Sequence, residues 1–291
     1  MPTRISTLSV MVGSPACNLR CPFCISKQTY KVGQSIPTGV HLDRIAYLAD
    51  KFLRVSEGLP YAILTGKGEP TLAPEEHIAD IIRTLTDLNG TGKGLIVELQ
   101  TNGSKLDRNK LECWKASGLN TLALSCVSHI DEVNSQIMSE RNVRWNLGDI
   151  ASTARGIGFL VRLTATMTQG GIENPDSLLA FLVFAKETGA QQITLREMGK
   201  PRDHTLQGSN DVADWIDAHF VDPKMAIETI CAAGAAEKDS LPWARRFSYL
   251  GMSVVITDTM SPPKDGMVRS GIIQPDGHLY GSWDDPADIL T

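Results

Sequence analysis

The chain has 291 residues, a net charge of −5 and an ordinary globular composition, with 42% hydrophobic and 21% charged residues. No basic stripe indicates a large nucleic acid as partner, and no apolar run reaches the roughly 20 residues that a membrane span requires. The segment MPTRISTLSV lacks the apolar stretch of a secretory signal. We therefore expect a cytoplasmic protein with no membrane partner and no disulfides.

Segments with the pattern of buried strands alternate with segments of helical spacing along the first 200 residues. The predicted strands lie in residues 7–12, 61–66, the first part of 94–103, 121–128, 159–168 and 191–198. The predicted helices are residues 41–55, 74–88, 106–118, 143–156 and 174–189. Strands separated by helices pair in parallel through right-handed crossovers. The pattern predicts the α/β class, as a partial (β/α)6 TIM-like barrel, with an open doubly wound sheet as the alternative.

Beyond residue 200 this alternation stops. Helical spacing returns at 210–219 and 223–237, and a strand-like segment covers 253–258. SGIIQPDGHLYGSW, residues 270–283, predicts a hairpin around Pro275-Asp276-Gly277. This hairpin either closes the edge of the sheet, which we favour, or folds over the barrel mouth and presents Asp276, His278, Tyr280 or Trp283 there. We therefore divide the chain into a barrel of residues 1–200 and a helical and hairpin extension of residues 201–291 that packs on the barrel.

Three of the six cysteines lie in one short loop, ACNLRCPFC, directly after the first predicted strand. Cys17, Cys21 and Cys24 have the spacing C-x3-C-x2-C, which in a reducing compartment indicates metal or redox chemistry. A zinc site completed by His41 or another cysteine is one alternative, and a group of inert thiols is another. Three thiolates in one loop can instead hold three irons of a [4Fe–4S] cluster and leave the fourth iron open.

With Phe23 before the last cysteine, this spacing resembles the signature of the radical S-adenosylmethionine (SAM) superfamily. The resemblance implies a three-cysteine-ligated [4Fe–4S] cluster whose open iron binds SAM. It also implies that SAM is cleaved to a 5′-deoxyadenosyl radical, with flavodoxin or ferredoxin as the electron donor. The barrel resembles that of the molybdenum-cofactor cyclase type, but Cys113, Cys126 and Cys231 are too widely spaced for an auxiliary cluster.

Polar motifs after the later strands extend the resemblance. Gly66-Lys67-Gly68-Glu69-Pro70 resembles the GGEP loop of the family, in which Glu69 would orient the amino group of SAM. Lys67 replaces a glycine of that loop and is therefore assigned to the substrate side. Gln100-Thr101-Asn102-Gly103 resembles the family's TNG exit. Ordinary turns are the alternative for both loops. The resemblance implies these cofactor-binding residues: Phe23, Gly66, Gly68, Glu69, Asn102, Ser125, Arg162 and Met198.

Two of these assignments, and the candidate catalytic residue Cys126, leave an alternative open. Arg162 lies on a predicted core strand, where a buried charge needs a partner. A salt bridge to Glu98, Glu197 or another acid of the barrel would meet this need as well as contact with SAM or an anionic substrate would. Met198 would hold adenine through its backbone or pack in the core. Cys126 would donate hydrogen to a product radical or be a buried inert thiol. Candidate substrate-facing residues are Lys67, Gln100, Arg196, Glu197, His278 and Tyr280.

A single-cluster barrel with basic residues at its strand ends favours a small polar metabolite as the substrate, such as a nucleotide, a sugar or an amino-acid derivative. A radical SAM enzyme that modifies a peptide or protein, including a glycyl-radical activase, is the first alternative. A non-catalytic metal-binding protein with a degenerate barrel is the second, and it belongs to a different functional class.

Overall fold

The computed structural model describes residues 4–13, 15–29, 41–56, 60–88, 95–139, 146–200, 209–241, 243–257, 267–283, 285 and 287–290. Its strands are β1 Arg4–Met11, β2 Tyr61–Thr65, β3 Ile96–Thr101, β4 Thr121–Cys126, β5 Leu160–Thr166, β6 Gln192–Arg196, β7 Ala236–Leu241, β8 Ala244–Tyr249, β9 Met252–Thr257, β10 Met267–Ile273 and β11 Leu279–Tyr280. Its helices are α1 Leu42–Val55, α2 Glu75–Asp87, α3 Arg108–Ala116, α4 Asp131–Met138, α5 Leu147–Ile157, α6 Pro175–Glu187, α7 Ser209–His219 and α8 Pro223–Ala232, with short 3-10 helices η1 Ile25–Lys27 and η2 Pro70–Leu72.

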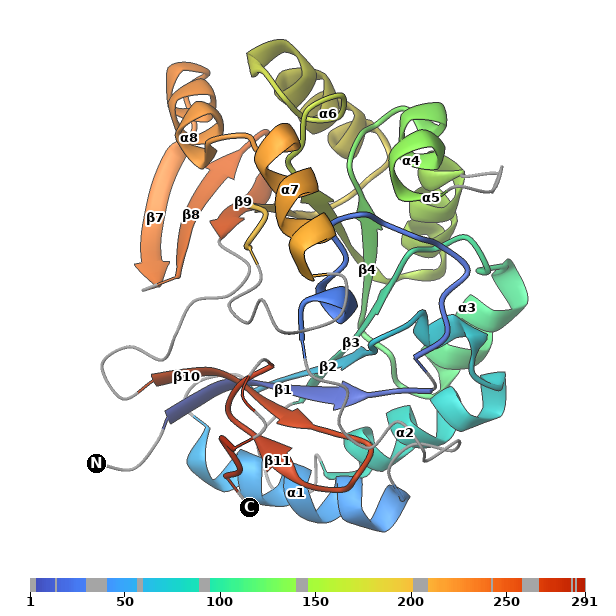
Figure 1. Ribbon diagram of the computed structural model, residues 1–291. Coiled ribbons are helices and arrows are strands. Elements are labelled where there is room, and N and C mark those ends of the chain that lie inside the picture. The colour runs from blue at the N-terminus through green and yellow to red at the C-terminus, as the bar shows by residue number, and fades with distance from the viewer. Residues whose placement is uncertain are drawn as a thin grey trace.

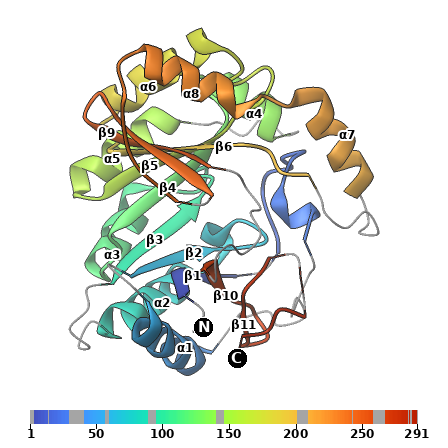
Figure 2. The ribbon, with the colours of Figure 1, turned by 90° about the vertical axis from the view of Figure 1, so that its left-hand side faces the viewer.

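One curved sheet organises the described residues. Its strand order is β11-β10-β1-β2-β3-β4-β5-β6-β9-β8-β7, and β1 to β6 are parallel neighbours in chain order. A doubly wound sheet would reverse its strand order partway, so this order confirms the partial barrel. The sheet does not close, and most helices lie on its convex side, whereas α7 lies at the open side beside the cysteine loop (Figures 1 and 2).

The alternation of side chains along the strands explains where the core sits. On β4, Leu122 and Leu124 face the helices and belong to the main hydrophobic core, whereas Ser125 lies in the wall of a cavity inside the barrel. On α1, the predicted apolar face is confirmed, because Ile45, Leu48 and Phe52 are almost fully buried. Each such burial contributes about 1.5–3 kcal/mol, so the helical shell is held by apolar packing.

The segment after residue 200 differs from its prediction in several elements. The helix expected to reach residue 237 ends at Ala232, and Gly234, with φ of +87°, turns the chain into β7. β7 and β8 were not predicted, and neither was α4. Residues 94, 143–145 and 258 of the predicted elements lie outside the described residues.

The predicted hairpin is confirmed, since β10 and β11 pair antiparallel around a turn in which Gly277 has φ of +81°. In addition, β10 pairs in parallel with β1, so the hairpin also extends the barrel wall. Strands from both sides of residue 200 belong to one sheet, and the proposed division at that residue stays a prediction.

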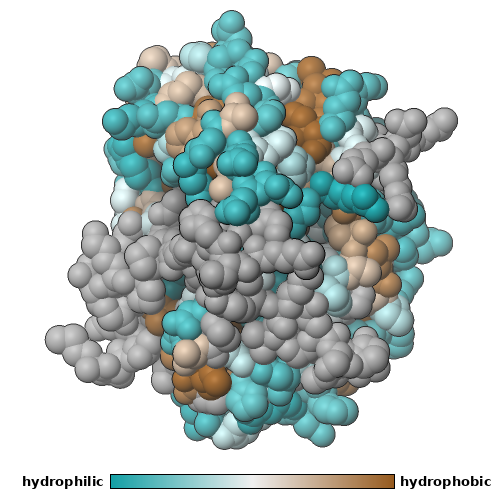
Figure 3. All heavy atoms as spheres, viewed as in Figure 1, coloured by the Kyte–Doolittle hydropathy of each residue, from teal (hydrophilic) through white to brown (hydrophobic). Residues whose placement is uncertain are grey.

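The described surface gives little sign of a large docking face. On the face in Figure 3, most described side chains are hydrophilic and the apolar ones form separate groups. The exposed large hydrophobic residues are spread over different elements: Tyr47, Leu72, Ile130, Val183, Phe220, Leu241, Leu250 and Ile289. None of the described helices has the length and apolar character needed to cross a membrane.

Candidate functional site

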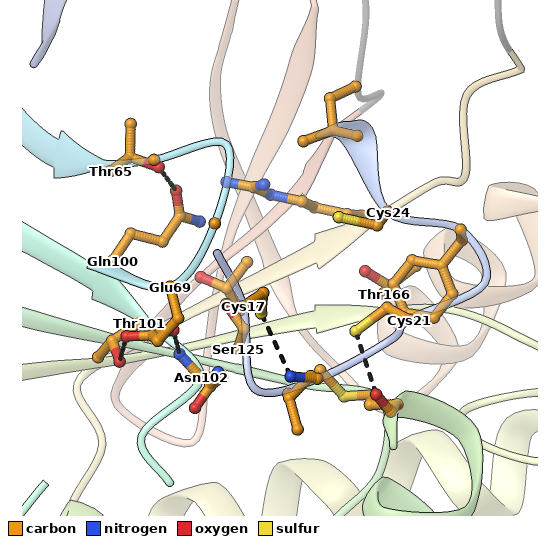
Figure 4. Close-up of a pocket in the computed structure, with 18 of the residues that line it drawn as sticks. Cys17, Cys21, Cys24, Thr65, Glu69, Gln100, Thr101, Asn102, Ser125 and Thr166 are labelled. Atoms are coloured by element: carbon orange, nitrogen blue, oxygen red, sulfur yellow. Dashed lines mark hydrogen bonds between the residues drawn. The ribbon is translucent and has the colours of Figure 1, made fainter. Parts of the chain in front are cut away.

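A cavity of about 200 Å³ lies where the cysteine loop covers the carboxyl ends of β2 to β6. We call it the first cavity. Figure 4 shows side chains from the loop and from several strands pointing into it. The predicted site residues that line it are Cys17, Cys21, Phe23, Cys24, Gly66, Gly68, Glu69, Gln100, Asn102, Ser125, Cys126, Arg196 and Met198. Most of the site expected from the sequence is therefore brought together in space.

The cysteine loop carries three thiols to the same wall. Leu19 donates its backbone N–H to the Cys17 sulfur at 3.4 Å, and the Cys21 thiol donates to the Met138 carbonyl at 3.6 Å. Cys24 follows one turn later and also lines the cavity. No group of three or more His, Cys, Asp or Glu side chains in the described part of the chain converges closely enough to hold a single metal ion.

Burial favours the protonated form of two of these thiols, those of Cys17 and Cys21. Burial raises the pKa of the Cys21 thiol far above its ordinary value, and the neighbouring Cys24 and Cys17 raise it further. Partial burial also raises the pKa of Cys17, and the nearby Glu69 carboxylate adds to that rise. A metal cation is the group that reverses this effect, since a coordinating thiol is deprotonated.

Glu69 is the most firmly held side chain of the first cavity. It is only 5% exposed, and its Oε1 accepts hydrogen bonds from the Thr71 N–H at 3.0 Å, the Thr71 hydroxyl at 2.6 Å and the Thr101 hydroxyl at 2.5 Å. Its Oε2 accepts the backbone N–H of Asn102 at 2.8 Å. Four donors on one carboxyl group fix its position and leave Oε2 with further acceptor capacity toward the cavity.

The Gly66–Pro70 loop and the cysteine loop touch through their backbones. The Glu69 N–H donates to the Ala16 carbonyl at 2.9 Å. A Cβ on Gly68 would overlap that same carbonyl oxygen, so glycine is the residue that fits here. The approach places Glu69 directly beside the first of the three cysteines.

A second link joins the cysteine loop to the exit of β3. The Asn102 amide donates to the Asn18 side-chain oxygen at 3.0 Å, and the Asn18 amide donates to the Ser104 hydroxyl at 2.7 Å. Gly103 completes the turn with φ of +79°. Asn102 is thus an anchor for the loop as well as part of the cavity wall.

An aromatic cluster packs on the outside of the cysteine loop. The rings of Phe23 and Trp215 lie 5.6 Å apart, and Trp215 stacks on His219 at 4.0 Å. Met198 packs in a small apolar group with Val212 and Ile216 of the same helix, α7. The role of α7 was not foreseen, because nothing in its own sequence indicates which loop it covers.

Arg162 is not part of the cavity wall. Its guanidinium forms an ion pair with Glu98 at 2.7 Å and also donates to the Gln192 side-chain oxygen at 2.6 Å. Tyr61 donates to Glu98 at 3.2 Å in the same group. The structure thus has the salt bridge that the sequence left open as the alternative to a SAM contact.

Cys126 borders the first cavity, but its side chain is almost fully shielded from solvent. It is fully buried in the main hydrophobic core and donates to the Thr164 carbonyl at 3.8 Å. Burial raises its pKa strongly. These surroundings are those of an inert thiol, the second of the two interpretations.

Three candidate substrate-facing residues, Glu197, His278 and Tyr280, do not line the first cavity. Glu197 directly follows β6, and its backbone N–H donates to the Thr257 carbonyl at 3.0 Å. His278 is half exposed beside Asp276, and Tyr280 is buried and donates to the Asp276 carboxylate at 2.7 Å. The hairpin contributes Trp283 to a cavity wall instead.

Lys67 lies in the wall of a second cavity, which adjoins the first on the inner side of β1 and β2. Lys67 is 7% exposed, donates to the Thr29 hydroxyl and places its Nζ 5.4 Å from the centre of the Trp283 ring. The inward-facing hydroxyl residues of both cavities, such as Thr65 and Thr166, were missed by the sequence analysis. Their strand alternation was the only signal that could have found them.

Comparison with known proteins gives a consistent set of relatives. The family model described as the Radical SAM superfamily matches residues 11–185. The chain is 27% identical over 179 residues to GTP 3′,8-cyclase 1 from Mycobacterium tuberculosis, and 30% identical over 181 residues to AdoMet-dependent heme synthase from Methanosarcina barkeri. Each match covers 60% of this chain but only 46% and 45% of those proteins, so the chain spans less than half of their length.

The fold also resembles solved structures. Native anSMEcpe with bound AdoMet superposes with a TM-score of 0.58 at 14% identity, over 99% of this chain and 76% of that chain. At this identity the likeness concerns the fold.

Proposed function

Because this chain belongs to the radical SAM superfamily, we propose that it binds a [4Fe–4S] cluster and SAM in the first cavity and abstracts hydrogen from a small polar metabolite. The observation that carries the proposal is that Cys17, Cys21 and Cys24 line the same cavity as Glu69, at the carboxyl ends of parallel strands. In barrel enzymes the reacting groups gather at that end of the sheet.

The donor set fits such a cluster. Three thiols from one loop supply sulfur ligands for three irons, and the fourth iron is left for the amine and carboxylate of SAM. When bound, the cluster supplies the electron that breaks a sulfonium C–S bond of SAM and releases the 5′-deoxyadenosyl radical. The loop backbone contacts the Cys17 sulfur, and the Met138 carbonyl contacts the Cys21 thiol, so both sulfurs have defined positions in the cavity wall.

The cavity residues have separate tasks in this proposal. Glu69 accepts the SAM amine, because its Oε2 has one hydrogen bond from the described residues and keeps acceptor capacity. Asn102 holds the loop in place, and Ser125 offers its hydroxyl to the ribose or carboxylate. Met198 offers its backbone to the adenine. The remaining contacts are assigned to Phe23, Gly66 and Gly68.

The substrate class rests on the size and polarity of the adjoining cavity. The second cavity has a volume of about 160 Å³, which suits a compact molecule better than a polypeptide segment. The two curated relatives carry the names of a GTP cyclase and a heme synthase, and both names describe small-molecule chemistry. We assign electron supply to a flavodoxin or a ferredoxin, by analogy with the superfamily.

Anaerobic reconstitution tests the proposal. The protein should take up about four irons and about four sulfides per chain. With SAM and a strong one-electron reductant it should then release methionine and 5′-deoxyadenosine in equal amounts. Binding of one zinc with no SAM cleavage would favour the non-catalytic metal-binding protein. Cleavage that occurs only with an added polypeptide would favour the peptide modifier or glycyl-radical activase.

A further inference from the structure

The second cavity shares part of its wall with the first. Five residues line both: Ile25, Thr65, Gly66, Gln100 and Arg196. A molecule in the second cavity would therefore lie directly beside one in the first. If the first cavity holds SAM, as proposed above, the second is the place for the substrate, and the inference below rests on that function.

Positive side chains gather in the second cavity. Lys67, Arg196 and Arg269 line it, and none of the lining residues that the structure describes carries a carboxylate. Arg269 also donates to the Thr257 hydroxyl at 3.1 Å. The Glu98 carboxylate lies deeper in the barrel, where Arg162 already pairs with it at 2.7 Å.

Arg196 is the central residue of this cavity, because one nitrogen of its guanidinium is buried without a hydrogen-bond partner among the described residues. It ends β6, and its Nε has no hydrogen-bond partner among the described residues. Burial, and then the neighbouring Arg269, lower its pKa to about 10, so it stays charged at neutral pH. A buried charged donor without an acceptor is costly, and a ligand oxygen would remove that cost.

The rest of the wall suits a polar molecule with one flat or apolar part. Ser9 and Ser270 share a hydrogen bond of 2.7 Å, and the Thr7 hydroxyl donates to the Arg269 carbonyl at 2.9 Å. Ile63 and the Trp283 ring provide apolar surface in the same cavity. The positive charges and the hydroxyls thus lie around one compact space.

We propose that the second cavity binds the substrate through an oxyanion group, a carboxylate or a phosphate, which the Arg196 guanidinium holds while Arg269 and Lys67 supply further positive charge. Arginine is suited to this role because its planar fork matches the geometry of both oxyanions. Arg196 lies at the boundary of the two cavities, so the anionic group fixes the substrate next to the site of radical formation.

The test measures anion binding to the reconstituted holoenzyme with SAM at saturation. Thermal unfolding is followed anaerobically at constant ionic strength with inorganic phosphate, with succinate, or with potassium chloride alone. Phosphate, succinate or both should raise the unfolding midpoint over chloride, and the responding anion assigns the oxyanion class. In Arg196→Gln the apparent affinity should fall at least about tenfold. Arg196→Lys should retain part of it.

One control variant and one parallel measurement make each outcome decisive. Arg54→Gln, on the exposed face of α1, should keep the full anion response. Equal responses in wild type and Arg196→Gln would overturn the inference, as would a response that is seen without SAM but is absent at saturating SAM. So would the absence of any response to either anion. Release of 5′-deoxyadenosine is measured on the same protein preparations. If SAM is cleaved but no anion response is seen, this inference is wrong and the proposed function is unaffected.

Discussion

The Glu69 carboxylate accepts the backbone N–H of Asn102 at 2.8 Å, and this hydrogen bond joins the exits of the neighbouring strands β2 and β3. The backbone N–H of Glu69 itself donates to the Ala16 carbonyl in the cysteine loop. One residue therefore ties together both strand exits and the loop that carries the sulfurs. Its side chain and its backbone can be tested separately.

Glu69→Gln tests the side chain. The amide keeps the size of the carboxyl group, but its NH2 group would face the hydrogen-bond donors of Thr71, Thr101 or Asn102. It also removes the negative charge that is proposed to face the SAM amine. We expect SAM affinity to fall about 10- to 100-fold, as for loss of a charged hydrogen bond, with iron content retained. Equilibrium dialysis with labelled SAM measures this. Glu112→Gln on exposed α3 is the matched control, and equal affinity in the two variants would contradict the assignment.

Gly68→Ala tests the backbone approach. The added methyl group would overlap the Ala16 carbonyl oxygen, so one of the two loops must move. We expect reconstituted iron content to fall well below that of the wild type. Gly156→Ala is the matched control, since nothing lies within 4 Å of a Cβ there and alanine favours the helix by about 0.5–1 kcal/mol. Full iron loading of Gly68→Ala would show that the close approach is dispensable.

Single Cys17→Ala, Cys21→Ala and Cys24→Ala variants test the cluster ligands. Each should lose stable iron–sulfur assembly, because two thiols leave two irons without protein ligands. Iron and sulfide analysis after reconstitution measures the loss. Cys113→Ala, in α3 and away from the cavity, should load as the wild type does. If any of the three variants kept its full iron content, that cysteine would not be a ligand.

Arg162→Met separates a structural role from a SAM contact. Removing the cation leaves the buried Glu98 carboxylate without its partner, which should lower the free energy of unfolding by about 3 kcal/mol. The double variant with Glu98→Gln should recover part of that loss. SAM affinity should stay unchanged. A tenfold weaker SAM affinity without a loss of stability would restore the cofactor contact expected from the sequence.

Tyr61 should make stability depend on pH in the alkaline range. Burial, and then the Glu98 charge, raise the pKa of Tyr61 to about 12, compared with about 10 in an unfolded chain. A raised folded-state pKa stabilises fully below the unfolded value, and that contribution is lost as the pH rises toward the folded value. Between about pH 10 and about pH 12 the wild type should therefore lose about 2 kcal/mol more than Tyr61→Phe. Denaturant titration at several pH values measures it, and parallel curves for the two proteins would refute it.

Local patterns were sufficient for the parallel core of the fold. The alternation of buried strands and amphipathic helices predicts β1 to β6 and their order, because both signals are written in neighbouring residues. β7 was missed because AEKDSL is exposed at every position and carries no apolar alternation. The pairing of β10 with β1 was missed for a different reason: pairing between distant strands leaves no local trace.

In the candidate site, too, local motifs were predicted, whereas features that depend on distant strands were not. Motifs contiguous in sequence, such as the cysteine loop and the Gly66–Pro70 loop, were predicted to meet, and their residues line one cavity. Arg269 could not be found, because it reaches the second cavity only through the position of β10, whereas Trp283 was among the hairpin residues that the sequence offered for the barrel mouth. For Arg162 the sequence supplied both interpretations, and only the location of Glu98 on the neighbouring strand β3 could separate them.

The pairing of β10 with β1 also sets an order of events during synthesis. Thr7 and Arg269, which meet in the wall of the second cavity, are 262 positions apart. At roughly 5–20 residues per second, the cysteines leave the ribosome some tens of seconds before that wall can form. Iron delivered to a nascent chain would therefore meet the cysteine loop before β10 has completed the wall of the neighbouring cavity.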